Sequence, residues 1–404
     1  MPHSLWCHNS RICRERKRTN VMSITQFLGM RSQQDLLKSR TMVHPNKITS
    51  QNPWTIEALR EHLQWAVDVE LYTIPYYMSA MYSVIDQASE ARRIVRSVVN
   101  QEMLHMQCAA NIANAYGCDL LIRSPHYGGK VPHLDFKNNP NRPTDVYTPY
   151  STEIGPMDAL RINTMCIIEC PGESSTTPSG PNAAEYSSIG EVYQAIREGA
   201  AMLSECIIAD NNQVAHFTST YPDVISLTVT NSCADYSLLD QVGGLIDLIV
   251  EQGEGADWPH DCCDADKPIN QRYEDYQQKL LAPEYQNQVD DIQPYWDHFQ
   301  KFTYLRKQAL PATFPLTFGS PRGRKNQQIL ISHFGHFLQL MNIVFNPIYQ
   351  QQLAKENGIT VEQVQQSAGA EFGTTMYKVG AAIAACWENG VPPTFSSQSN
   401  QQEQ

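Results

Sequence analysis

The chain has 404 residues, a hydrophobic fraction of 42% and a formal net charge of −12 at pH 7. A chain of this length and composition can bury a core without disulfides, as soluble globular domains do. The acidic balance argues against a nucleic-acid partner, which would require a basic surface, and no apolar run is long enough to span a membrane.

The two ends of the chain differ in composition from the middle. Residues 1–50 are basic and show little hydrophobic periodicity, and residues 393–404 are polar and rich in glutamine. Both compositions predict disorder. The N-terminus lacks the apolar core of a secretory signal, and the cysteines are scattered without a CxxC pair. We therefore expect free thiols and a cytoplasmic protein; an organelle presequence in the basic arm stays open as an alternative.

The first two predicted helices form a hairpin. Residues 54–85 have an apolar stripe at helical spacing that also contains Glu70, and residues 89–116 have a similar stripe that contains Glu102 and His105. Thr55 provides an N-cap for the first helix, and Gly117 ends the second. The short connection between them predicts antiparallel packing.

The rest of the chain alternates helices with long irregular stretches. Residues 118–187 are rich in proline, glycine and asparagine, which predicts a long crossover loop with a functional role. The motif Tyr147–Ser151 and the apolar run Ile162–Ile168 are exceptions within it. Further helices are predicted near 188 onwards and over 236–252, 326–345 and 371–389, and a polar insert at 255–325 separates them. Strand signals are weak. We predict an all-α domain over residues 51–392, built as a four-helix bundle with extra peripheral helices.

The predicted hairpin carries a candidate metal site. A carboxylate on an apolar helical stripe is costly to bury unless it is paired or bound to metal. His105 follows Glu102 by three residues, so the two side chains point the same way. Carboxylates with an imidazole suit iron or manganese in helical bundles. We predict that Glu70, Glu102 and His105 bind metal; the alternative is a surface Glu and a hydrogen-bonded core His.

The other half of such a site has to come from later helices. His333 lies on an apolar stripe of the helix 326–345, but Leu330 stands where a second Glu-x-x-His would have its Glu. Glu191 and Glu254 are the candidate carboxylates. For His333 the alternative is a core histidine bonded to a backbone carbonyl, and for Glu191 it is a capping box with Ser188. The six candidates match the ligand count of a di-iron site, and one ion or two stays open.

Three motifs of the hairpin resemble a known family. Glu70–Tyr77, Gln101–Met106 and Asn111–Gly117 look like the ferritin-like domain of the iminophenyl-pyruvate dimer synthases, and shorter matches follow in order to about residue 390. The resemblance implies a ferritin-like four-helix bundle with an iron site. It also implies oxidative chemistry on imines derived from aromatic amino acids in secondary metabolism. Tyr72 and Tyr76, close to Glu70, are candidates for a redox or hydrogen-bonding role.

These observations favour a non-haem iron oxidoreductase that acts on a small amino-acid-derived molecule with O2. The expected cofactor is one or two iron ions, with manganese as the alternative, and we expect no nucleic-acid or membrane partner. Homo-oligomerisation stays open. Two other hypotheses remain: a non-catalytic metal-binding protein, and an interaction domain with a degenerate bundle, which Leu330 favours.

Overall fold

The computed structural model describes residues 54–172, 180–181, 185–217, 226–254, 296–317 and 320–396. The predicted arm, most of the predicted tail and most of the insert 255–325 lie outside these ranges. Within them the regular elements are helices, and the β-pairing consists of single bridges from Val84 to Thr313 and from Leu134 to Tyr186. The prediction of an all-α fold is confirmed. In the part of the chain that is described, no helix is both long and apolar enough to cross a membrane.

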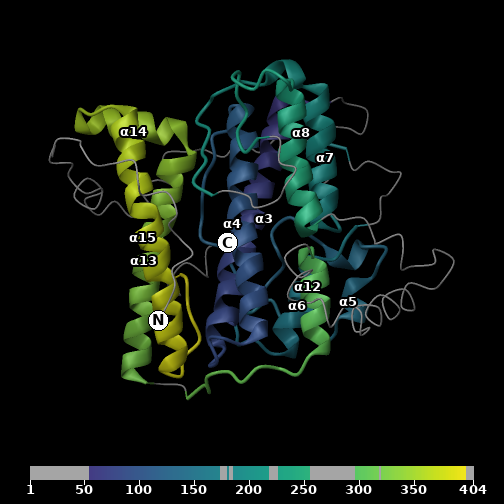
Figure 1. Ribbon diagram of the computed structural model, residues 1–404, viewed down its shortest axis with the longest axis vertical. Helices are drawn as coiled ribbons and strands as arrows, with labels where there is room; N and C mark the ends of the chain where they lie inside the picture. The colour runs from purple at the N-terminus through teal and green to yellow at the C-terminus, as the bar shows by residue number, and fades with distance from the viewer. Residues whose placement is uncertain are drawn as a thin grey trace.

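The predicted hairpin forms the centre of the molecule (Figure 1). α3 spans Ile56–Ser83 and α4 spans Glu90–Ala115, and the two pack along their length. The Thr55 hydroxyl accepts a hydrogen bond from the Ala58 amide at 3.2 Å, so the predicted N-cap is present. Gly117 has a φ of +63°, a left-handed conformation that glycine adopts without strain and that ends α4 as predicted.

Shorter helices complete the bundle on one side of this hairpin. In Figure 1, α7 and α8 lie along one half of it and α6 and α12 lie towards the other end. α8 continues into a π-helical turn, η3. Their bounds are α6 Ala159–Ile168, α7 Ile189–Met202, α8 Leu238–Ile249, η3 Val250–Glu254 and α12 His298–Lys307. Minor helical pieces are η1 Phe136–Asn138, α5 Pro143–Val146 and η2 Ser204–Cys206.

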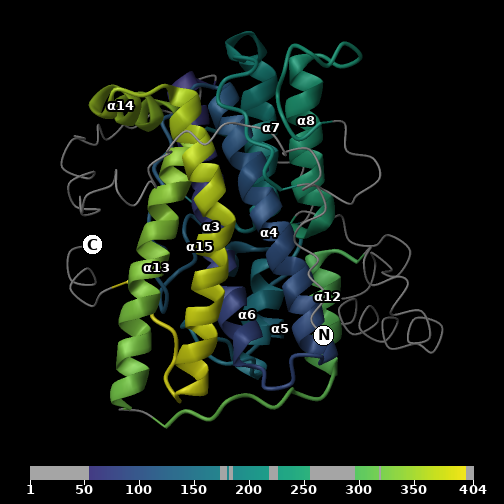
Figure 2. The same cartoon turned by 60° about the vertical axis from the view of Figure 1, so that its left-hand side comes forward.

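A second helix pair covers the other side of the hairpin (Figure 2). α13 (Pro321–Phe345) and α15 (Val361–Glu388) pack closely together, and α14 (Pro347–Asn357) connects them. Trp387 at the end of α15 is buried and donates its indole N–H to the Ser79 carbonyl of α3 at 2.9 Å. This bond and the surrounding apolar contacts fix the pair against the bundle.

The start of the last helix was predicted wrongly, for a local reason. The last helix starts at Val361, ten positions before the predicted start at 371, because Thr360 and Gln363 form a capping box ahead of a polar first half. Within the crossover stretch 118–187, the apolar run forms α6, which Asp158 caps at the Arg161 amide. Both helices begin at capping groups, which mark a helix start even where the hydrophobic pattern is short or absent.

Candidate metal centre

The carboxylates of Glu70 and Glu102 face each other across α3 and α4, and both are buried. The Tyr193 hydroxyl, from α7, donates a hydrogen bond to Glu70 Oε1. The Thr73 hydroxyl, one turn after Glu70, donates to Glu102 Oε2 at 2.8 Å. Each carboxylate is therefore oriented by a hydroxyl on one oxygen, which positions the other oxygen towards the centre of the bundle.

His105 lies one turn after Glu102 and its imidazole is oriented by η3. Its Nε2 lies 2.8 Å from the side-chain oxygen of Gln252. An amide oxygen only accepts hydrogen bonds, so Nε2 carries the proton and Nδ1 carries the lone pair. His105 Nδ1 lies 3.8 Å from Glu70 Oε2, so the lone pair is directed at the carboxylates. A hydrogen bond from the remote ring nitrogen is how proteins orient a metal-binding histidine.

Two residues from the other helices close the cluster. His298, the first residue of α12, has its Nδ1 2.9 Å from Glu102 Oε1 and 3.3 Å from Glu169 Oε2. Glu169 is the C-cap of α6, and its other oxygen accepts a hydrogen bond from the Tyr77 hydroxyl of α3. The His105 and His298 rings stack with centroids 5.2 Å apart. All of these side chains are buried.

Gly253 allows η3 and α12 to meet this closely. A β-carbon at Gly253 would lie 2.6 Å from the His298 β-carbon and 2.8 Å from its backbone nitrogen, which is far inside van der Waals contact. Only glycine leaves room for α12 to start at this point. The position of His298 thus depends on the glycine between Gln252 and Glu254.

Electrostatics in the cluster favour a cation. Burial alone would lower the pKa of the His298 imidazole, but the facing Glu102 and Glu169 carboxylates outweigh it and raise the pKa well above its ordinary value. Without a metal the cluster therefore binds a proton on His298 between two carboxylates. A metal ion that binds here replaces this proton, because a coordinating imidazole has to be neutral.

Comparisons with known proteins support the same fold. A ferritin-like family profile matches residues 63–280. The crystal structure of a ferritin-like protein from Caulobacter vibrioides is 32% identical to this chain, with a TM-score of 0.64, and the match covers 85% of this chain and 99% of that one. The chain belongs to the ferritin-like family. A comparison with curated proteins found no significant match.

The cluster fits the metal chemistry of ferritin-like proteins. Glu102, His105 and His298 each offer one ligand atom, and these atoms lie within 4.8 Å of one another. Ferritin-like bundles bind iron through carboxylates and imidazoles that project inward from facing helices. Glu70 and Glu169 add carboxylate oxygens at the same place, through the 3.8 Å and 3.3 Å contacts to His105 and His298. Hard oxygen donors with two imidazoles suit iron or manganese.

The ferritin-like fold brings together only part of the predicted ligand set. Glu70, Glu102 and His105 meet as the sequence indicated. Glu191 lies half-buried at the start of α7, where its carboxylate accepts a hydrogen bond from the Ser187 amide at 2.9 Å, so it serves the helix N-terminus. Glu254 is the last residue of η3, and its side chain lies outside the described part of the chain.

His333 is not brought to the cluster either. It lies on α13, in the second helix pair, where it is half-buried and has Lys378 and His336 as its charged neighbours. Burial, the Lys378 ammonium and His336 all lower the pKa of His333. Leu330, which stands in place of the expected Glu, is fully buried in the core. The break in the second Glu-x-x-His therefore concerns a helix that lies away from the ferritin-like cluster.

Glu169 and His298 were not predicted as ligands from the sequence. Glu169 directly follows the apolar run of α6 and precedes Cys170 and Pro171, a position where a carboxylate ends a buried helix. His298 follows Asp297, which forms a capping box with Gln300. That capping box is a sequence signal for a helix start, and with it His298 becomes a candidate in the first turn.

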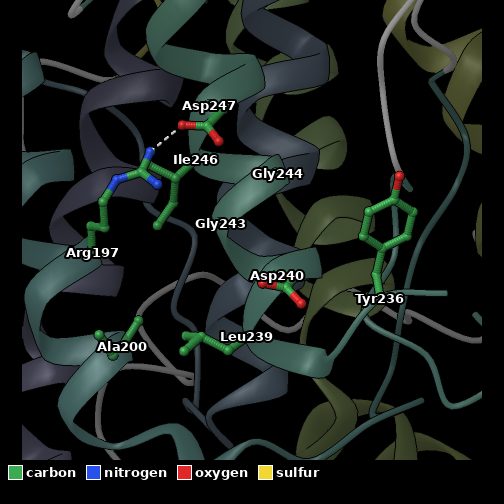
Figure 3. A pocket seen from close by; sticks show the side chains of 10 residues that line it. Arg197, Ala200, Tyr236, Leu239, Asp240, Gly243, Gly244, Ile246 and Asp247 are labelled. Atoms are coloured by element: carbon green, nitrogen blue, oxygen red, sulfur yellow. Dashed lines mark hydrogen bonds and ion pairs between the residues drawn. The ribbon is translucent and has the colours of Figure 1, made fainter.

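A separate cavity of about 590 Å³ lies on the surface between α7 and α8 (Figure 3). Arg197 and Asp247 form an ion pair across it, and Gly243 and Gly244 form part of its wall. Both charged side chains are substantially exposed, so solvent weakens their pairing. None of the cluster residues lines this cavity, which distinguishes it from the candidate metal centre.

Proposed function

We propose that this chain is a non-haem iron oxidoreductase that acts on a small amino-acid-derived molecule, such as an aromatic imine, with O2. The observation that carries the proposal is the buried meeting point of Glu102, His105 and His298, with their ligand atoms within 4.8 Å of one another. A buried set of carboxylates and imidazoles is costly without a bound cation. Membership of the ferritin-like family supports iron as that cation.

The residues around the ligands fix their geometry. Tyr193 donates to Glu70, Thr73 to Glu102 and Tyr77 to Glu169, and Gln252 accepts from His105. These bonds leave one oxygen or nitrogen of each ligand directed at the centre, which reduces the reorganisation needed on metal binding. Bound iron would supply one-electron chemistry and O2 activation there.

The substrate class rests on the resemblance of the hairpin motifs to the iminophenyl-pyruvate dimer synthases. Those motifs include Glu70, Glu102 and His105, which lie at the candidate centre. The alternative is a non-catalytic ferritin-like metal-binding or interaction protein, for which the same buried cluster would serve storage or stability.

The test starts from metal-free protein that is loaded with Fe(II) without oxygen and then exposed to O2. We expect oxygen consumption, a change in the iron absorption spectrum and conversion of an added aromatic amino-acid imine, all absent in Glu102→Ala. Glu191→Ala is the matched control, because it removes a carboxylate outside the cluster and should behave like wild type. Iron that binds but neither consumes O2 nor converts the imine would support the non-catalytic alternative. No retained iron would contradict both metal-based functions.

A further inference from the structure

A buried lysine lies beside the candidate metal centre. Lys301 is on α12, one turn after His298, and its side chain is only 1% exposed. Its ammonium group donates a hydrogen bond of 2.6 Å to the side-chain oxygen of Gln101, the residue before Glu102 on α4. Fully buried lysines are rare unless paired with opposite charge. The reason for a buried cation at this point therefore has to be sought in the surrounding charges.

Those charges are the carboxylates of the cluster. Burial lowers the pKa of Lys301 to about 8, and Asp297, Glu102 and Glu169 oppose that shift electrostatically. Asp297 is half-exposed at the N-terminus of α12, so solvent screens its charge, whereas Glu102 and Glu169 are fully buried. The ammonium form dominates at neutral pH. At neutral pH Lys301 is thus a positive charge within electrostatic reach of two proposed ligands.

The charges of the described buried residues leave room for one divalent ion. Glu70, Glu102 and Glu169 bring three negative charges when ionised, and Lys301 brings one positive charge. His105 and His298 are neutral when they bind metal. Two negative charges remain, which one divalent cation neutralises. A second divalent cation would leave a net positive charge in a low-dielectric interior, which is unfavourable.

We infer that Lys301 sets the metal stoichiometry of this centre. Its ammonium group supplies positive charge that a second divalent ion would otherwise supply, and so limits the centre to one ion. Lys301 acts through the electrostatic field of its ammonium group at the cluster, and it does not coordinate the metal itself. The inference rests on the proposed function, since it requires that the cluster binds metal. It concerns the number of ions bound and not the reaction.

The experiment is an anaerobic titration with Fe(II), with loose metal removed by gel filtration and the iron per chain measured by elemental analysis. Wild type should retain one ion. Lys301→Met, which keeps the length and loses the charge, should retain more than one ion per chain, because the second ion then leaves a net charge of +1 instead of +2 and its affinity rises at least about tenfold. Gln101→Glu, which pairs the ammonium with a new carboxylate, should shift the stoichiometry in the same direction. Lys307→Met, an exposed lysine of the same helix, should retain one.

Thermal unfolding separates the electrostatic role from a structural one. In Lys301→Met the rise in melting temperature on adding Fe(II) should be larger than in wild type, because binding to the folded state is tighter. An equal loss of melting temperature with and without Fe(II), with the stoichiometry unchanged at one, would overturn the inference and leave the proposed function intact. Two tightly bound ions in wild type would do the same. No retained iron in any variant would overturn the inference together with the proposed function.

Discussion

Two helix pairs of this ferritin-like protein carry histidine and glutamate, and only one of them forms a metal centre candidate. On α3 and α4 the side chains are buried and meet His298 and Glu169 from other helices. On α13 and α15 the His336 Nε2 and Glu371 Oε2 lie 3.4 Å apart, with 23% and 24% of the side chains exposed. Burial and convergence from several helices, rather than residue type, therefore distinguish a metal site from a surface ion pair.

The largest expected effect is a loss of stability when the buried Trp387 contact between α15 and α3 is removed. Trp387→Ala removes a buried indole and its bond to Ser79, and should destabilise the fold by about 3–5 kcal/mol. Metal content of the folded protein should stay as in wild type, because α15 supplies no member of the cluster. Chemical denaturation and elemental analysis measure the two quantities. Loss of metal from folded Trp387→Ala would show that the second pair contributes to the centre.

A buried histidine outside the cluster shows how burial lowers the pKa of an imidazole that faces no carboxylate pair. His62 of α3 contacts the Ala58 carbonyl and the Tyr186 hydroxyl, and burial lowers its pKa to about 4. The His62 imidazole therefore binds a proton more readily in the unfolded state than in the folded state. The stabilising contribution of neutral His62 is complete above about pH 6.5. As the pH falls towards 4 the free energy of unfolding decreases, by about 2–3 kcal/mol at pH 4.5.

The check is chemical denaturation of metal-free protein at pH 7 and 4.5. His62→Gln, which does not titrate in this range, should lose less stability than wild type between the two pH values. Using metal-free protein for both keeps the contribution of the cluster matched. An identical pH dependence in the two proteins would contradict the buried, neutral assignment of His62.

Gln252 tests how the imidazole of His105 is oriented. Gln252→Leu removes the acceptor of the 2.8 Å bond and should weaken metal binding by about 10- to 100-fold. Gln252→Glu keeps an acceptor at the same place and should retain most of the affinity. Titration with Fe(II) under anaerobic conditions measures both. Equal affinity in Gln252→Leu and wild type would mean that this bond does not orient a ligand.

The smallest effect on stability is expected for the His336–Glu371 ion pair between α13 and α15. His336→Ala breaks a half-exposed ion pair with Glu371 and should cost less than about 1 kcal/mol. Iron content should not change. A stability loss several times larger, measured by denaturation, would show that the α13 and α15 pair relies on this contact.

The sequence predicted the hairpin and three residues of the cluster, because the helical periodicity that places them is a local feature. The apolar period of α3 and α4 places Glu70, Glu102 and His105 on one side of two neighbouring helices. The capping group Thr55 and the C-terminal Gly117 fixed the boundaries. The family and the all-α class follow from the same segments.

The positions of Glu169 and His298 were not predictable, because they depend on tertiary contacts between short helices. Glu169 and His298 are more than a hundred positions apart and come to the centre through the end of α6 and the start of α12. His333 was favoured instead because its helix has a long, regular apolar stripe. Periodicity shows that a residue faces a core, and cannot show which neighbouring helix it will meet.

The central claim is that His298, rather than His333, completes the metal centre. Anaerobic loading with Fe(II) of wild type, His298→Ala and His333→Ala, followed by elemental analysis of the folded proteins, tests it directly. The account predicts iron in wild type and His333→Ala, and loss of iron in His298→Ala. Iron retained in His298→Ala and lost from His333→Ala would contradict it.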